Sequence, residues 1–255
     1  MADEMMGVAK RVAYIQAEDS PKWTTDDFLR KIWAQAVDLP LGEVELFQAT
    51  AGILPQDIGA FAGVVIGGSR HNVTDGLAWM PGLFDFIRRC AEYPAVRVVA
   101  VCFGCQAVAA ALDGEVGFNP TGKFRYTRER IRVDTATWDV LPKELSLMVA
   151  HGQQVTRRPP ESTLVADSHG SPNELFFAGK HRNILCCQSH PEFDPEHCID
   201  NISPALVKSG LLSAADARAA DLAFQAGPLD SHILRSVLRM WLVEDHVVPR
   251  IPCDF

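Results

Sequence analysis

The sequence lacks long runs of any one character, and each absence excludes a class of function. It has no basic cluster, and its 24 Lys and Arg residues stand against 32 Asp and Glu, which gives a net charge of −8. Nucleic acids and anionic membranes bind basic surfaces, so we expect neither as a partner. The N-terminal MADEMMGVAKRVAYIQ is acidic before it is basic, and its apolar run is too short for a secretory signal or a membrane span.

Internal repeats, low-complexity segments and Gly/Ser-rich linkers are also missing. A chain of 255 residues without such a linker suits one large domain, so we expect residues 1–255 to form a single domain. The seven cysteines are an odd number, and no export signal accompanies them. We therefore expect reduced thiols and a cytoplasmic protein.

What the sequence does contain is an alternation of short apolar segments with helical stretches. The apolar segments have strand character at 11–18, 44–50, 61–68 and 96–101, and the stretches between and after them have helical character at 26–37, 77–92 and 105–112. The last two strand segments are apolar without alternation, which is typical of strands buried on both faces. This pattern predicts an α/β fold with three layers, in which a mostly parallel central sheet has helices on both faces.

The pattern changes between residues 115 and 190, where short strands are separated only by turns. The expected strands are 115–118, 128–135, 145–150, 162–168, 174–179 and 183–189. Helical segments return at 195–208 and 231–244. We therefore expect an antiparallel strand extension of the central sheet before the final helices.

The stretch VVAVCFGCQAVAAALDG, residues 98–114, contains the first candidate for catalysis. Cys102 ends a buried strand and a helix of small residues follows at once. A nucleophile elbow has this setting, because the sharp turn exposes the side chain above the sheet edge. The N-terminus of the helix also favours the thiolate.

Three other interpretations of these cysteines remain open at this point. A lone cysteine is more often a small hydrophobic core residue. Cys102-Phe103-Gly104-Cys105 also matches the CxxC redox motif, although it follows about the fourth strand of a chain much longer than a thioredoxin-like domain. A zinc site would need a second pair of ligands at close spacing, and CCQSHPEFDPEH, residues 186–197, offers no clean one.

That same stretch supplies what a thiol nucleophile needs. His190 ends a strand segment, and Glu192 follows it across Pro191. A thiol needs a base, and the base needs an acceptor to orient it, so Cys102, His190 and Glu192 are a candidate triad. Such a triad requires no metal and no cofactor.

A glycine pair completes the candidate site. In VVIGGSRHN, residues 64–72, the pair Gly67-Gly68 ends a strand, where backbone N–H groups can closely approach an oxyanion. Together with the N–H of Phe103, these groups form a predicted oxyanion hole.

Taken together, these motifs resemble the class I glutamine amidotransferase family, whose members use a Cys-His-Glu triad. The family pattern Gly-x-Cys-x-Gly-x-Gln appears here as Ala100 to Gln106, with alanine in place of the first glycine. HGQQV at 151–155 resembles the family's His-Gly-Asp-x-Val, and QSHPEF at 188–193 resembles its Gln-x-His-Pro-Glu-Phe. The matches run in the expected order from about residue 61 to 195.

The resemblance implies a flavodoxin-like class I amidotransferase fold with Cys102, rather than Cys105, as nucleophile. By the same resemblance, Gln106, His151 and Gln153 are expected to bind the substrate. Gln153 stands where the family usually has Asp. The CxxC spacing is then a coincidence of the elbow pattern.

The segments GGSRHNVTDGLAWMPGL and SPNELFFAG are similar to those of the free-standing plant γ-glutamyl peptidases. This resemblance implies a cysteine-dependent hydrolase of γ-glutamyl amide or peptide bonds, with glutamine or a γ-glutamyl peptide as its small-molecule substrate. One alternative is a glutaminase subunit that gives ammonia to a partner synthase. A second alternative is an inactive, amidotransferase-like regulatory protein.

Overall fold

The structure is a computed structural model that describes residues 11–243, so Cys253 and both ends of the predicted single domain lie outside the described residues. Nine of its strands form one sheet in the order β2-β1-β3-β4-β11-β10-β9-β6-β7, and β5 pairs with β8 in a second, small sheet. The strands are β1 (Val12–Gln16), β2 (Val44–Gln48), β3 (Gly63–Ile66), β4 (Arg97–Val101), β5 (Glu115–Phe118), β6 (Arg125–Val133), β7 (Glu144–His151), β8 (Gln153–Arg157), β9 (Ser162–Ser168), β10 (Leu175–Ala178) and β11 (Ile184–Cys187).

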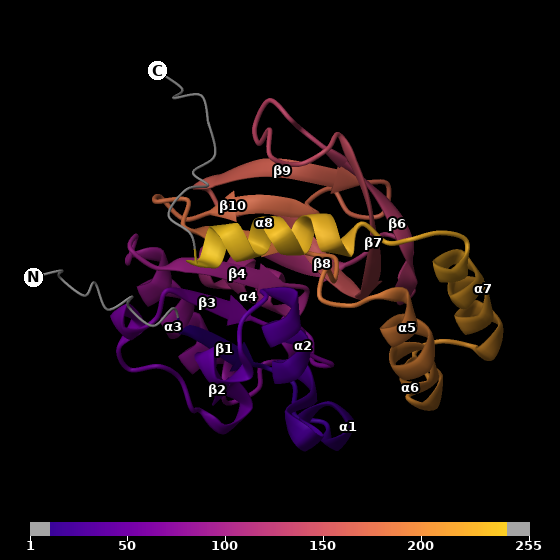
Figure 1. Ribbon diagram of the computed structural model, residues 1–255, viewed down its shortest axis with the longest axis horizontal. Coiled ribbons are helices and arrows are strands. Elements are labelled where there is room, and N and C mark those ends of the chain that lie inside the picture. Colours follow the sequence, from indigo (N-terminus) through magenta and orange to yellow (C-terminus); the bar gives the residue numbers. More distant parts are fainter. Residues whose placement is uncertain (1–10, 244–255) are drawn as a thin grey trace, which may run out of the picture.

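Helices cover both faces of the sheet, as Figure 1 shows. They are α1 (Pro21–Thr24), α2 (Phe28–Ala36), α3 (Met80–Ala91), α4 (Phe103–Ala111), α5 (Pro195–His197), α6 (Ser203–Lys208), α7 (Ala214–Gln225) and α8 (Ser231–Val243). Short 3₁₀ turns occur at Thr25–Asp27, Leu41–Glu43, Ala49–Ala51, Ile58–Ala60 and Val73–Asp75, and one π-helical turn occurs at Cys198–Ile202.

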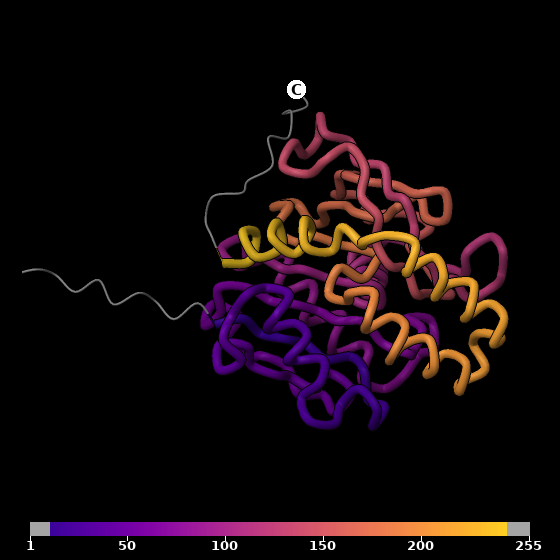
Figure 2. Tube along the Cα trace, turned by 45° about the vertical axis from the view of Figure 1, so that its right-hand side comes forward, coloured from indigo at the N-terminus to yellow at the C-terminus, as the bar shows by residue number. Residues whose placement is uncertain are grey.

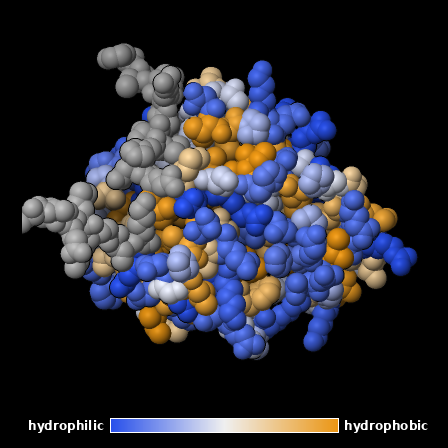
Figure 3. Space-filling model, in the orientation of Figure 1, coloured by the Kyte–Doolittle hydropathy of each residue, from blue (hydrophilic) through white to orange (hydrophobic). Residues whose placement is uncertain are grey.

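The core lies in two hydrophobic clusters, one on each side of the sheet. Helices α2 and α8 pack in the first cluster, and α3 and α4 pack in the second. In α8 the apolar residues Leu234, Val237, Leu238 and Trp241 recur at helical spacing, which gives one continuous buried face. On the face seen in Figure 3, hydrophilic residues predominate and apolar groups are scattered among them. The predicted three-layer α/β architecture is confirmed.

The five strands β2, β1, β3, β4 and β11 pair in parallel, and β11, β10, β9, β6 and β7 continue the sheet in antiparallel pairs. The antiparallel extension is therefore confirmed, but its boundary differs from the prediction. The segment 183–189 was expected within the extension, whereas β11 lies beside β4 with Cys186 opposite Ala100. Its run of four fully buried residues fits a central parallel strand.

Two segments have a conformation that the sequence analysis did not predict. HGQQV, for which no strand was predicted, contributes to β8, whose register places Gln153 opposite Phe118 of β5. The expected helix 195–208 is split into α5, the π-helical turn and α6. Helix α7 was not expected from the sequence, and its small apolar face packs Phe224 against Tyr126. Within residues 11–243, every helix is too short or too polar to span a lipid bilayer.

Candidate active site

Cys102 occupies a strained turn between β4 and α4. Its φ of 51° and ψ of −107° lie where L-residues with a side chain are uncommon. The Cys102 N–H donates to the Cys187 carbonyl oxygen at 2.8 Å, which continues the pairing of β4 with β11 up to the turn. A side chain at Gly104 would collide with the Ile66 carbonyl oxygen, so only glycine lets α4 begin this close to β3. The strand–turn–helix elbow expected at Cys102 is present.

His190 and Glu192 lie directly beside this turn. The backbone N–H of His190 donates to the Met148 carbonyl oxygen at 2.8 Å, which joins the segment after β11 to β7. The ring Nδ1 of His190 lies 2.8 Å from Glu192 Oε1, and the Cys102 side chain lies close enough for its charge to raise the pKa of the ring. Cys102 Sγ itself donates to the Ala150 carbonyl oxygen at 3.6 Å. All three side chains are buried. The structure thus brings the three residues of the predicted triad together.

The electrostatics of this group favour a charged imidazole. Burial alone lowers the pKa of His190, but the negative charges of Glu192 and Cys102, together with the hydrogen bond that the ring donates to Glu192, outweigh burial and hold this pKa well above 6.5. An imidazolium beside the sulfur stabilises a thiolate. The arrangement is therefore suited to nucleophilic attack by sulfur.

Two of the three N–H groups predicted to form an oxyanion hole lie next to the sulfur without a partner among the described residues, and the third is paired. The Gly67 N–H donates to the Ile15 carbonyl oxygen at 3.2 Å, because the pairing of β3 with β1 continues one residue beyond β3. Its predicted contribution is therefore wrong. The N–H groups of Gly68 and Phe103 donate to no other residue within 11–243. A Cβ at Gly68 would lie 3.2 Å from His190 Cε1 and 3.8 Å from Cys102 Cβ, so this backbone passes directly over the Cys102 and His190 side chains.

Glu18, which the sequence analysis missed, ties together the two loops that bring Gly68 to the sulfur. One carboxylate oxygen of Glu18 accepts from the N–H groups of Asp19 and Ser20 at 3.1 and 2.7 Å, and the other accepts from the Arg70 N–H at 2.8 Å. Glu18 is buried. The sequence offered one signal for Glu18, since it is an acidic residue at the end of the first predicted strand segment. The carboxyl ends of parallel strands meet at one edge of the sheet, where sites are commonly found.

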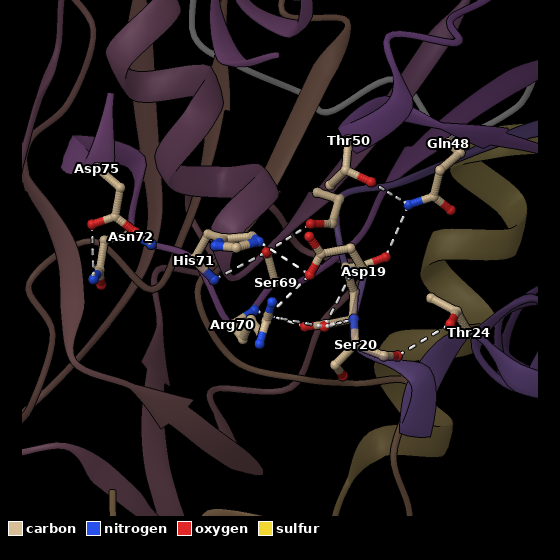
Figure 4. Close-up of polar contacts among 12 residues, drawn as sticks. Asp19, Ser20, Thr24, Gln48, Thr50, Ser69, Arg70, His71, Asn72 and Asp75 are labelled. Carbon is tan, nitrogen blue, oxygen red and sulfur yellow. Dashed lines mark hydrogen bonds and ion pairs between the residues drawn. The ribbon is translucent and has the colours of Figure 1, made fainter. Parts of the chain in front are cut away.

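A second layer of contacts surrounds this carboxylate, as Figure 4 shows. Ser69 Oγ donates to the Ala17 carbonyl oxygen at 2.7 Å and accepts from the His71 N–H at 3.1 Å. Asp19 Oδ1 lies 2.9 Å from Arg70 Nε and 3.2 Å from His71 Nε2. These bonds fix the loop after β3 against the loop after β1.

The three residues expected to bind substrate are all buried and line the same cleft as Cys102. Gln106 Nε2 donates to the Gln153 carbonyl oxygen at 2.7 Å, and Gln153 Nε2 donates to Thr74 Oγ1 at 2.7 Å. Neither ring nitrogen of His151 nor Gln153 Oε1 has a partner among the described residues. Burial, together with the charges of Arg125 and His190, lowers the His151 pKa to about 3, so its ring is neutral. These unpartnered buried atoms are available to a ligand.

The redox interpretation finds little support around the elbow. Cys105 is fully buried, and burial together with a hydrogen bond that its thiol donates to Cys186 raises its pKa well above 9.0. A thiol in such a setting is inert. Among residues 11–243, no group of three or more His, Cys, Asp or Glu side chains could hold a metal ion.

The cleft extends well beyond the triad. Its volume is about 670 Å³, and it runs from Cys102 and His190 to α1 and α6. Residues of these two helices that line its far end are Lys22, Trp23, Pro204, Ala205, Leu206 and Lys208. The sequence analysis singled out none of them, since each belongs to a segment whose residues show no motif.

Comparison with known proteins connects this geometry with characterised families. The family model described as glutamine amidotransferase class-I matches residues 28–201. The chain is 26% identical over 168 residues to γ-glutamyl peptidase 4 of Arabidopsis thaliana, a match that covers 63% of this chain and 66% of that protein, slightly less than two thirds of its length. It is 33% identical over 97 residues to a glutamine-hydrolysing GMP synthase of a Parafrankia strain, covering 38% of this chain and 18% of that protein. The solved glutamine amidotransferase of Thermotoga maritima has the same fold, with a TM-score of 0.69, 17% identity, and coverage of 91% of this chain and 97% of that one.

Proposed function

Because the chain belongs to the class I glutamine amidotransferase family, we propose that it is a cysteine-dependent hydrolase of γ-glutamyl amide and peptide bonds. The observation that carries this proposal is the extent of the cleft. At about 670 Å³ it falls in the range that accommodates ligands of drug size, and it continues from the sulfur of Cys102 past the triad to α1 and α6. A leaving group larger than ammonia has room there.

In the proposed first step, the Cys102 thiolate attacks the γ-carbonyl carbon of the substrate. The carbonyl oxygen becomes an oxyanion and accepts hydrogen bonds from the Gly68 and Phe103 N–H groups. The imidazolium of His190 then gives its proton to the leaving amine as the carbon–nitrogen bond breaks, which leaves a γ-glutamyl thioester on Cys102. Glu192 holds the His190 ring by its bond to Nδ1, so that the opposite nitrogen faces the sulfur.

In the proposed second step, neutral His190 removes a proton from a water molecule that attacks the thioester carbon. Glutamate leaves, and the proton returns the Cys102–His190 pair to its starting state. Gln106, His151 and Gln153 are proposed to bind the γ-glutamyl part. Gln153 supports a peptide substrate, because a neutral side chain does not repel an anionic leaving group as the usual carboxylate would.

A second candidate is a glutaminase subunit that supplies ammonia to a separate synthase. The similarity of residues in this chain to a GMP synthase favours it. A subunit of that kind is expected to release ammonia slowly until its partner is present. An inactive regulatory role is disfavoured by the contact of Cys102 with His190 and of His190 with Glu192.

The test is a side-by-side assay of the purified protein alone on glutamine, glutathione and a glutathione S-conjugate, with products identified by mass spectrometry. The proposal expects glutamate to be released from the peptides without any partner protein. Release from glutamine alone, and only after a synthase is added, would contradict it.

We further propose that the chain forms one catalytic domain. We also propose that the protein works in a reducing compartment such as the cytoplasm. The cleft is lined by residues of β1, α1, α4, β7 and α6, which come from most of the length of the described chain. Six cysteines within residues 11–243 are buried free thiols, which a reducing compartment preserves.

A further inference from the structure

The far end of the cleft carries two lysines that no step of the proposed mechanism uses. Lys22 belongs to α1 and Lys208 is the last residue of α6, and both line the cleft. Helices α1 and α6 lie in the same lower part of the molecule in Figure 1, and the indigo and orange segments that contain them lie toward the lower right of Figure 2. Lys22 Nζ also donates to the Asn201 carbonyl oxygen just before α6. Segments nearly 180 residues apart in the chain thus present two cations to one space.

Within residues 11–243, no carboxylate pairs with either of these two ammonium groups. Partial burial and the charge of Lys208 lower the pKa of Lys22, so the two groups are close enough to repel each other. Arg70, which also lines the cleft, is by contrast paired with Asp19 at 2.9 Å. A bound anion between the lysines would replace this repulsion with attraction.

An apolar wall lies next to the lysines. Trp23 packs against Phe28 with ring centroids 5.6 Å apart, and Lys22 Nζ lies 4.6 Å from the centre of the Trp23 ring. Leu206 and Leu211 line the same part of the cleft, and 48% of Leu211 is exposed. A hydrophobic group placed here would cover surface that is now in contact with water.

Building on the proposed hydrolase activity, we propose that Lys22 and Lys208 bind the carboxylate of the leaving group while Trp23 and Leu206 contact its hydrophobic side chain. The favoured substrates are then γ-glutamyl peptides that end in a free carboxylate and carry a hydrophobic residue or substituent. The leaving group of glutamine is ammonia, which has neither a carboxylate for the lysines nor a side chain for the apolar wall.

Two substrates that differ only in that carboxylate provide the test: γ-glutamyl-phenylalanine and γ-glutamyl-phenylalaninamide. The wild-type protein should hydrolyse the acid with a kcat/KM about tenfold higher than the amide, through KM, since partly exposed charge-assisted contacts are of modest strength. The Lys22→Gln/Lys208→Gln variant should lose this preference and leave kcat unchanged. Lys31→Gln, an exposed lysine of α2 outside the cleft, is the matched control. Raising the salt concentration should raise KM for the acid only.

The outcomes distinguish a failure of the proposed lysine subsite from a failure of the proposed hydrolase function. Equal kcat/KM values for acid and amide in the wild type, unchanged in the lysine variant, would overturn the subsite and leave the hydrolase standing. The Lys22→Glu/Lys208→Glu variant should prefer the amide, and a persistent preference for the acid would overturn it too. If neither compound is hydrolysed, the proposed function fails. Calorimetric binding of the uncleaved acid to Cys102→Ala, with and without the lysine substitutions, then decides the subsite by itself.

Discussion

The two ends of the cleft are built in different ways. At the triad end, Cys102, His190 and Glu192 follow central strands and are buried, and His190 is hydrogen-bonded to Glu192. At the far end, Lys22 and Lys208 lie on two short helices and are exposed, and Lys22 Nζ donates to the backbone oxygen of Asn201. Reacting atoms must be held within fractions of an ångström, whereas selection among leaving groups tolerates looser contacts. Substitutions at the triad end should therefore change kcat, and those at the far end should change KM.

The sharpest test of this difference is the pair Cys102→Ala and Cys105→Ala. Loss of a catalytic nucleophile typically lowers kcat by roughly 10⁴- to 10⁶-fold, so Cys102→Ala should remove essentially all turnover. Cys105 is buried on the far side of the elbow and should tolerate alanine with most of the activity kept. Steady-state assays of both variants, with folding checked by circular dichroism, measure the effect. Equal losses from the two variants would instead support a CxxC redox pair.

The second prediction concerns a buried carboxyl behind the triad end. Burial raises the pKa of Glu174 to about 7 despite hydrogen bonds from Ser168 and Ser189. Because the folded-state pKa exceeds the ordinary value of 4.5, the folded protein favours the protonated form. Its contribution to stability is complete below about pH 4.5 and decreases as the pH rises to about 7. Across that window the loss is about 3 kcal/mol.

Urea unfolding of the wild type and Glu174→Gln at a series of pH values measures this effect. Glutamine keeps the shape and does not titrate, and the two serine hydroxyls can reverse their bonds to suit it. The free energies of unfolding of the two proteins should thus diverge by about 3 kcal/mol between pH 4 and 8, with the variant relatively more stable at high pH. Lys208→Gln, an exposed substitution that leaves the Glu174 carboxyl in place, is the control and should keep the shape of the wild-type curve. If the free energies of unfolding of Glu174→Gln and wild type instead change in parallel with pH, the raised pKa of Glu174 is refuted.

The third prediction returns to the backbone over the sulfur. An alanine Cβ at Gly68 would lie 3.2 Å from His190 Cε1, so either the ring or the loop must shift. We expect Gly68→Ala to lower kcat by roughly 10²-fold, because displacement by a fraction of an ångström disturbs both the base and an oxyanion donor. Gly82→Ala in α3 is the control, since its Cβ would meet nothing within 4 Å. Wild-type kcat in Gly68→Ala would remove Gly68 from the proposed oxyanion hole.

Sequence patterns predicted the parallel half of the fold well, because buried parallel strands are continuously apolar and amphipathic helices alternate with them. They also indicated Cys102, His190 and Glu192, since strand ends converge on one edge of the sheet. The sequence patterns assigned β11 to the antiparallel half of the sheet, although it pairs in parallel with β4. An apolar run predicts a buried strand but does not indicate which strand it pairs with. The prediction that the Gly67 N–H is an oxyanion donor was wrong for a related reason. The pairing of β3 with β1 continues one residue past the end of β3 and occupies this N–H.

The far end of the cleft could not be predicted from the sequence. Its side chains come from α1 and α6, which are brought together only by the packing of short helices on the finished sheet. Lys22 and Lys208 are ordinary surface lysines until the structure places both against one cavity. Catalytic residues leave local motifs because each needs a particular turn, whereas a specificity surface assembled from distant helices needs none.

The smallest expected effect lies between the two ends, at Glu18. Glu18→Gln keeps one carbonyl oxygen but places an amide NH₂ against at least one of the backbone N–H groups of Asp19, Ser20 or Arg70. A buried donor without an acceptor costs about 1–3 kcal/mol, and the loop carrying Gly68 should loosen. We expect kcat to fall about tenfold with KM for glutamine and the pH profile unchanged, because Glu18 acts only by positioning that loop. Asp19→Asn is the matched control, since its partly exposed ion pairs contribute little. An unchanged kcat in Glu18→Gln, or an equal loss in Asp19→Asn, would mean that the loop needs no buried carboxylate to stay over the sulfur, and the rigidity of the triad end would then have to come from the sheet alone.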